Sequence, residues 1–266
     1  MPLSNLPTHT SASALGCYAS CPRKFEHRYV LKTEPEYRST GLALGTAVHG
    51  AVAWWFTEKI EQRTPTLGEA LKILQADLSA ALAYPGVKWK GDTPESLLAD
   101  AEKLMRLFVE KYGDLPVVET EVRFDMPIVD PDTGETMPRP CMGYFDLELH
   151  DGTIIELKTA QKSYSATDLR VNLQFACYRT AARYFGDVNV DVLALIKTKV
   201  PKVQHVELHP SREIATWFMR AAAAIERGIA AGIFPPSPGP MCGSCEYGQA
   251  CLGIESEVAD GEAQAA

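Results

Sequence analysis

The sequence lacks a long apolar run and lacks the features of a secretion signal. No segment approaches the roughly 18 consecutive apolar residues of a membrane-spanning helix. The N-terminal stretch MPLSNLPTHTSASALG has neither a basic region nor an apolar core. We therefore expect a cytoplasmic protein with no membrane partner. No internal repeat is present, and the proportions of 46% hydrophobic and 23% charged residues are those of an ordinary globular chain.

Positive charge is also scarce, because 34 acidic residues outnumber 26 basic ones and give a net charge of −8. This balance gives no general reason to expect nucleic-acid binding. Residues 157–206 are the exception, with eight basic and three acidic side chains. Salt screens charges over about 10 Å, so a local basic stripe can still follow a phosphate backbone. The alternative is a solvated face, and Lys197, Lys199 and Lys202 are the candidates for DNA contact.

The seven cysteines, an odd number, do not suit a disulfide framework in a reducing compartment. Three of them, Cys242, Cys245 and Cys251, lie within ten residues near the C-terminus. Clustered thiols of this kind indicate metal ligands or redox groups.

Hydrophobic periodicity and turn signals predict a helical first part followed by a mixed α/β part. Helices are expected over 11–31, broken at Pro22, and over about 42–62, 67–84 and 94–113, the last two each opened by a Thr-Pro pair. Strands are expected at 117–129, 140–149, 152–160, 191–198 and 203–208. Further helices are expected at 167–185 and from Ser211 to about 231.

These elements divide the chain into four expected parts. Residues 1–115 form a mainly helical region, 116–234 an α/β core, 235–254 a cysteine cluster that packs back on the N-terminal region, and 255–266 a disordered tail.

The hairpin GYFDLELHDGTIIELKTA, residues 143–160, carries the side chains best suited to chemistry. Glu156 and Lys158 are two residues apart on an apolar strand and so project from one face. Burying both charges there costs several kcal/mol unless they are paired or bound to a metal. The alternative is an ion pair on a wet face, which contributes roughly 0–1 kcal/mol.

Strand register decides whether Asp146 lies on the same face of the hairpin as Glu156 and Lys158. A two-residue loop at Asp151-Gly152 would direct Asp146 away from Glu156, whereas a three-residue loop or a bulge would place both carboxylates on one face. Two such carboxylates can hold Mg²⁺ or Mn²⁺, and a neighbouring lysine can stabilise charge on a phosphate.

This pattern, Asp146 followed by Glu156-x-Lys158, resembles the PD-(D/E)XK nucleases. Three further motifs resemble their RecB-like branch: Gly45-x-x-x-His49, Gln174-x-x-x-Tyr178, and an N-terminal pattern of Ser13, Leu15, Tyr18, Cys21-Pro22 and Phe25. One departure is that Tyr144-Phe145 precedes Asp146, where the superfamily name has proline.

The resemblance implies a restriction-endonuclease-like fold, in which helices flank a mixed central sheet. It implies Mg²⁺ or Mn²⁺ bound by His49, Asp146, Glu156 and the carbonyl of Leu157. Lys158 would stabilise the transition state or position water. Gln174 and Tyr178 would orient the lysine, the water or the DNA backbone.

The cysteine spacing is similar to that of iron–sulphur members of this branch, including AddB-type nuclease domains and CRISPR-associated exonucleases. By this resemblance Cys21, Cys242, Cys245 and Cys251 would bind a [4Fe–4S] cluster that clips the termini together. Structural Zn²⁺ is the alternative, since Cys₄ sites also suit zinc. Cys17 competes with Cys21 for the fourth place.

The function implied is a metal-dependent exonuclease that degrades linear double-stranded DNA, 5′ to 3′, in a bacterial or phage-infected cell. Its single-stranded tails would serve an annealing protein in phage-type recombination. A CRISPR adaptation nuclease, an endonuclease of the same fold and a non-catalytic DNA-binding scaffold with a zinc clip are the alternatives. No Gly-x-x-x-x-Gly-Lys phosphate loop is present, and no oligomer interface is evident.

Overall fold

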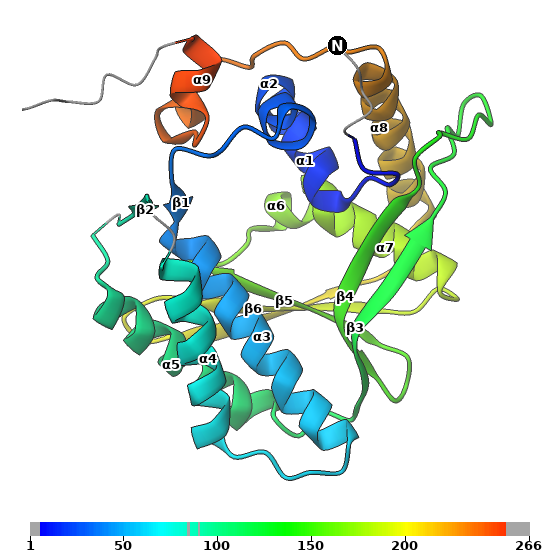
Figure 1. Cartoon of the computed structure of the whole chain (residues 1–266). Coiled ribbons are helices and arrows are strands. Elements are labelled where there is room, and N and C mark those ends of the chain that lie inside the picture. The colour runs from blue at the N-terminus through cyan, green and yellow to red at the C-terminus, as the bar shows by residue number, and fades with distance from the viewer. Residues whose placement is uncertain (1–5, 84–85, 90, 254–266) are drawn as a thin grey trace, which may run out of the picture.

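A computed structural model describes residues 6–83, 86–89 and 91–253 and shows a mixed sheet between two layers of helices (Figure 1). The tail expected over 255–266 lies outside the described residues. Within them, no helix combines the length and apolar character needed to cross a membrane.

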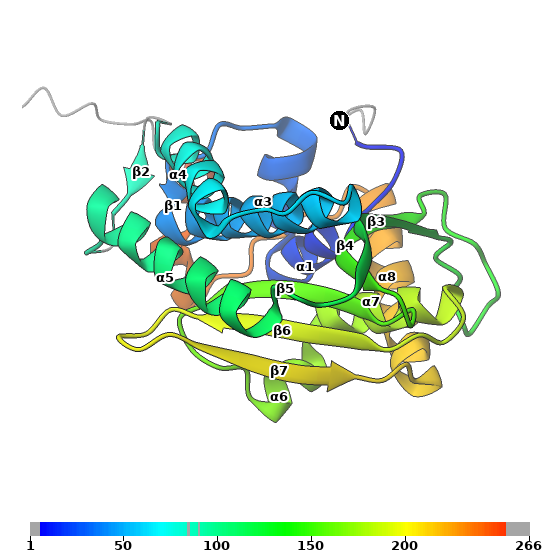
Figure 2. The same ribbon diagram turned by 90° about the horizontal axis from the view of Figure 1, so that it is seen from below.

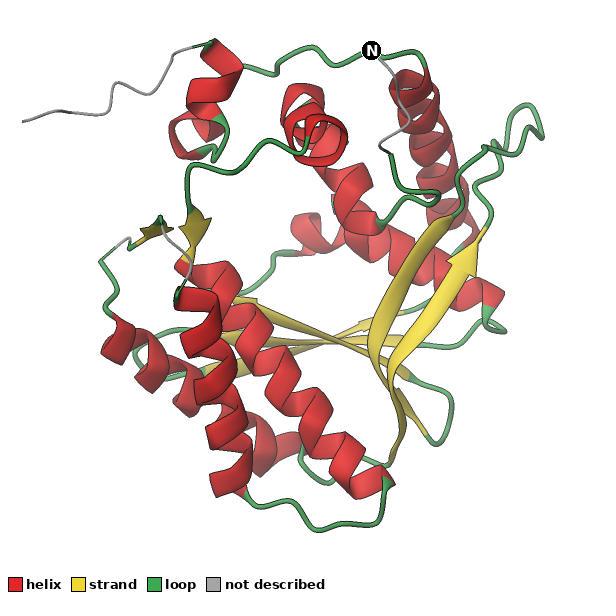
Figure 3. Cartoon of the chain, in the orientation of Figure 1, coloured by secondary structure: helices red, strands yellow, loops and turns green. Residues whose placement is uncertain are grey.

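The sheet has five strands in the order β3-β4-β5-β6-β7. Only β5 and β6 are parallel neighbours; the other pairs are antiparallel. Figure 3 shows β3 and β4 turning away from the other three strands. All five strands occur where the sequence predicts them, with ends shifted by three residues or fewer. They are β3 (Val117–Met126), β4 (Cys141–Leu149), β5 (Ile154–Ala160), β6 (Val190–Ile196) and β7 (Lys202–Leu208).

Each face of the sheet is covered by its own set of helices and its own apolar core (Figures 1 and 2). On one side Val48, Leu74 and Leu104 belong to the same apolar core as Leu157 and Leu195 of the sheet. The helices there are α3 (Thr40–Ile60), α4 (Leu67–Leu82) and α5 (Pro94–Tyr112). The helices on the other side are α1 (Ala12–Ser20), α7 (Leu173–Tyr184) and α8 (Arg212–Ala230).

Two of the helices begin directly after a residue whose side chain caps the first turn. The Thr-Pro pair predicted to open α4 does not do so, because Thr66 caps this helix and Glu69 bonds back to Thr66 N at 2.9 Å. This reciprocal capping box satisfies two donors at once, which Thr64 cannot do. At α5 the predicted Thr93-Pro94 pair is the start, with Thr93 as the cap.

The helix expected over 167–185 is two helices, α6 (Ala166–Val171) and α7. Asn172 separates them, and its side-chain oxygen accepts hydrogen bonds from the N–H groups of Gln174 and Phe175. An asparagine cap of this kind starts a new helix axis. The correction matters for the site, since Gln174 and Tyr178 both belong to α7.

The N-terminal helix is broken at Pro22, as predicted. The following segments are α2 (Pro22–Phe25) and the π-helix η2 (Glu26–Leu31), after which β1 (Arg38–Ser39) pairs with β2 (Val87–Lys88). Near the C-terminus are η3 (Pro240–Ser244) and α9 (Gly248–Leu252).

The C-terminal segment contacts the N-terminal one at several points. Lys24 Nζ lies 2.8 Å from a carboxylate oxygen of Glu246, the backbone N–H of Glu36 donates to Glu246 O at 2.9 Å, and Tyr18 donates to Ile233 O at 2.7 Å. The division of the chain into four parts stays a prediction.

Candidate active site

The site lies where β4 and β5 separate. Leu149 N donates to Thr153 O, which closes a three-residue loop over 150–152, and Leu147 and Glu148 pair with Ile155 and Ile154. This is the odd loop that a shared face for the two carboxylates requires. Regular pairing of the two strands stops at Leu147, one residue before Asp146 would meet Glu156.

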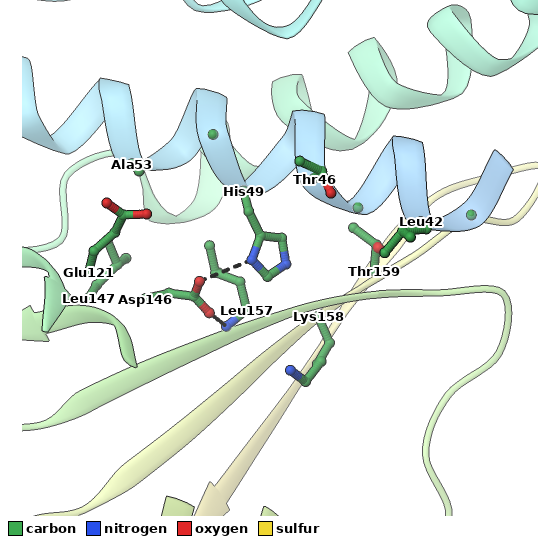
Figure 4. Close-up of a pocket in the computed structure, with 13 residues that line it drawn as sticks. Leu42, Thr46, His49, Ala53, Glu121, Asp146, Leu147, Leu157, Lys158 and Thr159 are labelled. Atoms are coloured by element: carbon green, nitrogen blue, oxygen red, sulfur yellow. Dashed lines mark hydrogen bonds and ion pairs between the residues drawn. The ribbon is translucent and has the colours of Figure 1, made fainter. Parts of the chain in front are cut away.

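Asp146 occupies the gap between the strands. Its Oδ2 accepts a hydrogen bond from Leu157 N at 2.7 Å, so a side chain, not a β4 carbonyl, satisfies that N–H of β5. Its Oδ1 accepts from Nδ1 of His49, on α3, at 3.0 Å (Figure 4). The structure therefore brings two residues predicted from separate motifs into direct contact.

The contact with Asp146 favours the protonated form of His49. Burial, the largest influence, lowers the His49 pKa, but the hydrogen bond and charge of Asp146 outweigh it and the net pKa is raised. The Asp146 bond fixes Nδ1 as a donor, and in Figure 4 the other ring nitrogen lies on the side of the ring away from Asp146.

Glu156 is the most buried acidic side chain of the site, with 2% of its surface exposed. One carboxylate oxygen forms an ion pair with Lys158 Nζ, and the other, Oε2, has no hydrogen-bond partner among the described residues. Burial and then the nearby Asp146 carboxylate raise the pKa of Glu156 to about 7. An unsatisfied buried oxygen costs roughly 1–3 kcal/mol and demands an explanation.

The α7 motif, Gln174 and Tyr178, lies beside this ion pair. Gln174 Nε2 donates to the Tyr178 hydroxyl at 3.0 Å, and Lys158 Nζ lies 5.4 Å from the centre of the Tyr178 ring. Burial, followed by the Glu156 carboxylate, raises the pKa of the Tyr178 hydroxyl, which keeps it protonated. The motif thus contacts the lysine side of the site.

The predicted residues form two adjoining groups. His49 and Asp146 make one, and Glu156 and Lys158 with the α7 motif make the other; in Figure 4 Lys158 points to the opposite side of β5 from His49. Within the described ranges no three potential ligand side chains are grouped as a metal site. The metal-ligand set, including the Leu157 carbonyl, therefore stays a prediction.

A cavity of about 550 Å³ opens between α3 and the separated strands. His49, Asp146 and Lys158 all line it. Gly45 allows α3 this close approach, since a Cβ there would lie 3.0 Å from Thr159 Oγ1 at the end of β5. This contact gives a physical reason for the glycine in the Gly45-x-x-x-His49 motif.

Glu121 is a cavity residue that the sequence analysis missed. It lies in β3 between Thr120, paired with Leu147, and Val122, paired with Phe145, yet its φ is +54°. A non-glycine residue in this region costs on the order of 1–3 kcal/mol, and such strain clusters at functional sites. Its carboxylate lies in the cavity beside Asp146 (Figure 4). The sequence carries no signal for it, because a glutamate is common on the exposed face of a strand.

The three lysines proposed for DNA contact have different surroundings. Lys197 lies 2.9 Å from Asp92 and 3.4 Å from Asp100. Burial lowers the Lys197 pKa, but these ion pairs outweigh it and the net pKa is raised. Lys199 and Lys202 are exposed. Because its charge is already compensated, Lys197 is the weakest of the three candidates, and the DNA contacts stay predictions.

The cysteines differ in how readily they ionise. Burial raises the pKa of Cys17 to about 11. Burial also opposes ionisation of Cys21, but hydrogen bonds from the backbone of Lys24 and Ser237 outweigh it and lower its pKa. Thiolates are the metal-binding form, so Cys21 suits a ligand better than Cys17.

Cys242 and Cys251 are exposed and Cys245 is half-buried. Across 6–83, 86–89 and 91–253 no grouping of three or more thiols or other ligands is present, so the cluster stays a prediction.

Comparison with known proteins agrees with the fold. Among solved structures, a protein from Eubacterium rectale whose name gives it a provisional assignment as an exonuclease superposes with a TM-score of 0.57 at 13% identity, over 90% of this chain and 88% of that one. A second structure, SSO0001, has 15% identity and a TM-score of 0.39, over 88% of this chain and 94% of that one. No curated protein matches the chain.

The sequence model of the PD-(D/E)XK nuclease superfamily matches residues 9–252, which is nearly the whole chain and includes both groups of site residues. This match, together with the mixed sheet and the divergence of β4 and β5 around Asp146, establishes the family: the chain belongs to the PD-(D/E)XK nuclease superfamily.

Proposed function

We propose that this protein is a metal-dependent DNA exonuclease that hydrolyses phosphodiester bonds from the ends of linear double-stranded DNA. The observation that carries the proposal is Glu156, a nearly fully buried carboxylate that has one unsatisfied oxygen, pairs with the ammonium of Lys158 and lies near the charge of Asp146. Burying these charges without a functional reason would destabilise the folded protein by several kcal/mol. A chemical role therefore explains their position.

Nucleases of this superfamily usually use divalent metals, and the donors present fit such an ion. Glu156 Oε2 has no partner among the described residues, and carboxylate oxygens are the ligands that Mg²⁺ and Mn²⁺ prefer. His49, Asp146, Glu156 and the Leu157 carbonyl would hold the ion. When bound, the ion would activate water and neutralise charge on the phosphate.

The side chains have separate tasks in this proposal. Lys158 stabilises negative charge that develops on the phosphate, because an ammonium in a buried site interacts strongly with such charge. Tyr178 packs beside the lysine and Gln174 fixes the Tyr178 hydroxyl. The His49 bond to Asp146 orients that carboxylate.

We further propose 5′ to 3′ digestion that leaves single-stranded tails for an annealing protein in phage-type recombination. The similarity of fold to the Eubacterium rectale protein supports an exonuclease fold. The direction and the recombination role rest on the motif resemblance alone.

A [4Fe–4S] cluster at Cys21, Cys242, Cys245 and Cys251 completes the proposal, with structural Zn²⁺ as the alternative. The contacts between residues 18–36 and 233–249 support it, because they already bring the two cysteine-bearing segments together. The cluster would be structural, fastening the ends of the chain.

The test is a nuclease assay on end-labelled linear DNA and covalently closed circular DNA, with Mg²⁺, Mn²⁺ or EDTA, using protein purified without oxygen. We expect brown, iron-containing protein that shortens linear DNA from the 5′ ends only when metal is present. A Lys158→Met variant should lose cleavage.

Cleavage of the closed circle would replace the exonuclease with an endonuclease. Binding without cleavage by colourless, zinc-containing protein would favour the scaffold. Digestion from the 3′ ends would reject the proposed direction alone.

A further inference from the structure

A second cavity, of about 600 Å³, lies outside the catalytic groups. It is bounded by the π-helix η2, the strand β1, the first turn of α3 and the segment around η3. Its charged lining residues are mostly basic: Lys24, Arg28 and Arg38, with Glu246 as the acidic one. We name it the basic cavity.

The charge of this cavity is unusual for the molecule. The protein carries a net charge of −8, yet here basic side chains outnumber acidic ones three to one. Glu246 forms an ion pair with Lys24 at 2.8 Å, so the acidic side chain of the lining is already offset by one of the basic ones. The charge of Arg28 remains, and the cavity thus suits an anion.

Aromatic side chains accompany the positive charge. Tyr37 and Tyr247 line the cavity. Tyr247 is 5% exposed and its ring stacks on His27, whereas Tyr37 is half-buried, with Lys88 Nζ 4.1 Å from the centre of its ring. Of the two, Tyr37 is the ring available to a base. The Tyr37 hydroxyl is buried and has no hydrogen-bond partner among the described residues. Rings on which bases can stack, together with basic groups that follow phosphates, are the two components of single-strand binding sites.

The basic cavity adjoins the catalytic one. Leu42, on the first turn of α3, lines both cavities and is 60% exposed. His49 follows Leu42 on the same helix. Ser39, the cap of α3, also lines the basic cavity, so the positive end of a 21-residue helix dipole lies at its edge. A polynucleotide strand can therefore extend from one cavity to the other across Leu42.

We propose that the basic cavity binds nucleotides of a single DNA strand whose scissile phosphate lies in the catalytic cavity. The inference rests on the proposed nuclease function and adds to it a site of strand recognition beyond the reacting bond. Leu42 separates the two parts of the strand. Arg28 contacts phosphate, and Tyr37 stacks on a base.

Binding measurements with the inactive Lys158→Met protein test this site. We would measure the anisotropy of labelled single-stranded oligonucleotides, in EDTA, across a series of lengths and salt concentrations. Arg28→Ala should weaken binding of long oligonucleotides about tenfold. It should also make the slope of log K against log salt concentration shallower by roughly 0.7, the value expected for one single-strand phosphate contact. Arg106→Ala, which removes an exposed arginine from α5, is the matched control and should change neither quantity.

The outcomes separate this inference from the proposed function. If the wild-type protein neither binds nor cleaves DNA, the nuclease proposal fails. If the Lys158→Met protein binds the oligonucleotides, and adding Arg28→Ala changes binding no more than adding Arg106→Ala, the basic cavity is not a strand site. A free deoxynucleoside monophosphate should not displace the oligonucleotide at an equal phosphate concentration; if it does, the cavity takes a free nucleotide and the inference is overturned.

A measurement without an arginine variant covers the case in which Arg28→Ala fails to fold. Oligonucleotides carrying a photoreactive iodouracil base can be cross-linked to the Lys158→Met protein and the adducts mapped by mass spectrometry. Adducts on Tyr37 are expected. Adducts confined to the catalytic cavity would contradict the inference.

Discussion

At the scale of single residues, the site is defined by where charge is buried. Glu156 combines nearly complete burial with an unsatisfied oxygen, and Asp146 replaces a backbone carbonyl as acceptor for Leu157 N. Glu121 adds a strained backbone angle at the same cavity. These three features involve acidic residues that, by residue type alone, would pass as surface residues of strands.

The raised pKa of Glu156 gives a stability prediction. Because its pKa is about 7 in the folded protein and near 4.5 when unfolded, the favourable neutral form is present below pH 4.5 and is lost as pH rises through 7. At pH 8 the Glu156→Gln variant should therefore have a higher free energy of unfolding than the wild type, by on the order of 1–3 kcal/mol. At pH 4.5 the two proteins should differ little.

Urea unfolding in EDTA at both pH values measures this effect. Glu119→Gln, an exposed residue of β3, is the control and should show no such pH dependence. Equal shifts for both variants would reject the assigned pKa. Nuclease activity of Glu156→Gln should be lost, because the carboxylate is gone although the fold is kept.

At the scale of elements, the approach of α3 to β5 positions His49. Gly45 faces Thr159 closely, whereas a Cβ added at Gly41, one turn earlier, would meet no neighbouring described atom within 4 Å. The same residue type therefore serves different purposes on one helix. The Asn172 cap acts similarly on the other side, since it starts α7 where Tyr178 lies beside the lysine and Gln174 bonds the Tyr178 hydroxyl.

Substitution of the two glycines separates these roles. Gly45→Val should destabilise the protein by about 1–3 kcal/mol, because its side chain overlaps Thr159, and should lower nuclease activity by shifting His49. Gly41→Val should change stability by less than about 0.5 kcal/mol. Thermal unfolding measures both.

A second substitution provides the decisive comparison. Thr159→Ala in the Gly45→Val background should recover part of the lost stability, because residues in contact are coupled. Additive effects of the two changes would argue against the close contact as the reason for Gly45.

At the scale of the whole molecule, hydrogen bonds and an ion pair join the two cysteine-bearing segments. The C-terminal segment contacts α2 and the loop before β1, and so encloses the basic cavity from one side. Fastening segments more than 200 residues apart restricts the unfolded chain, and a metal cluster that does so stabilises the fold.

Cys245→Ser tests the proposed cluster at this scale. We expect lost iron and visible absorbance, a lower melting temperature by several degrees, and weaker DNA cleavage, because the walls of the basic cavity loosen. Leu252→Ala, an exposed neighbour, should retain iron and melting temperature. Full iron content in Cys245→Ser would remove this cysteine from the ligand set.

Local patterns predicted much of the fold. Alternating and continuous apolar runs located every strand of the central sheet, because a strand buried on a sheet leaves that signature in sequence. The predicted cap of α4 and the single helix over 167–185 were wrong in detail. Both depend on which of several polar side chains satisfies a set of backbone donors, and short-range pattern does not rank them.

The sequence by itself determined which residues are the candidates: the spacing of Asp146, Glu156 and Lys158 in the hairpin predicted the shared face and the need for an odd loop, and the family resemblance added the histidine motif. Only the tertiary structure decided that His49 bonds Asp146, that Glu156 keeps an unsatisfied oxygen and that a basic cavity adjoins the site across Leu42. The physical reason is that these features join residues that lie far apart along the chain. Burial and long-range contact, which set them, exist only once the chain has folded.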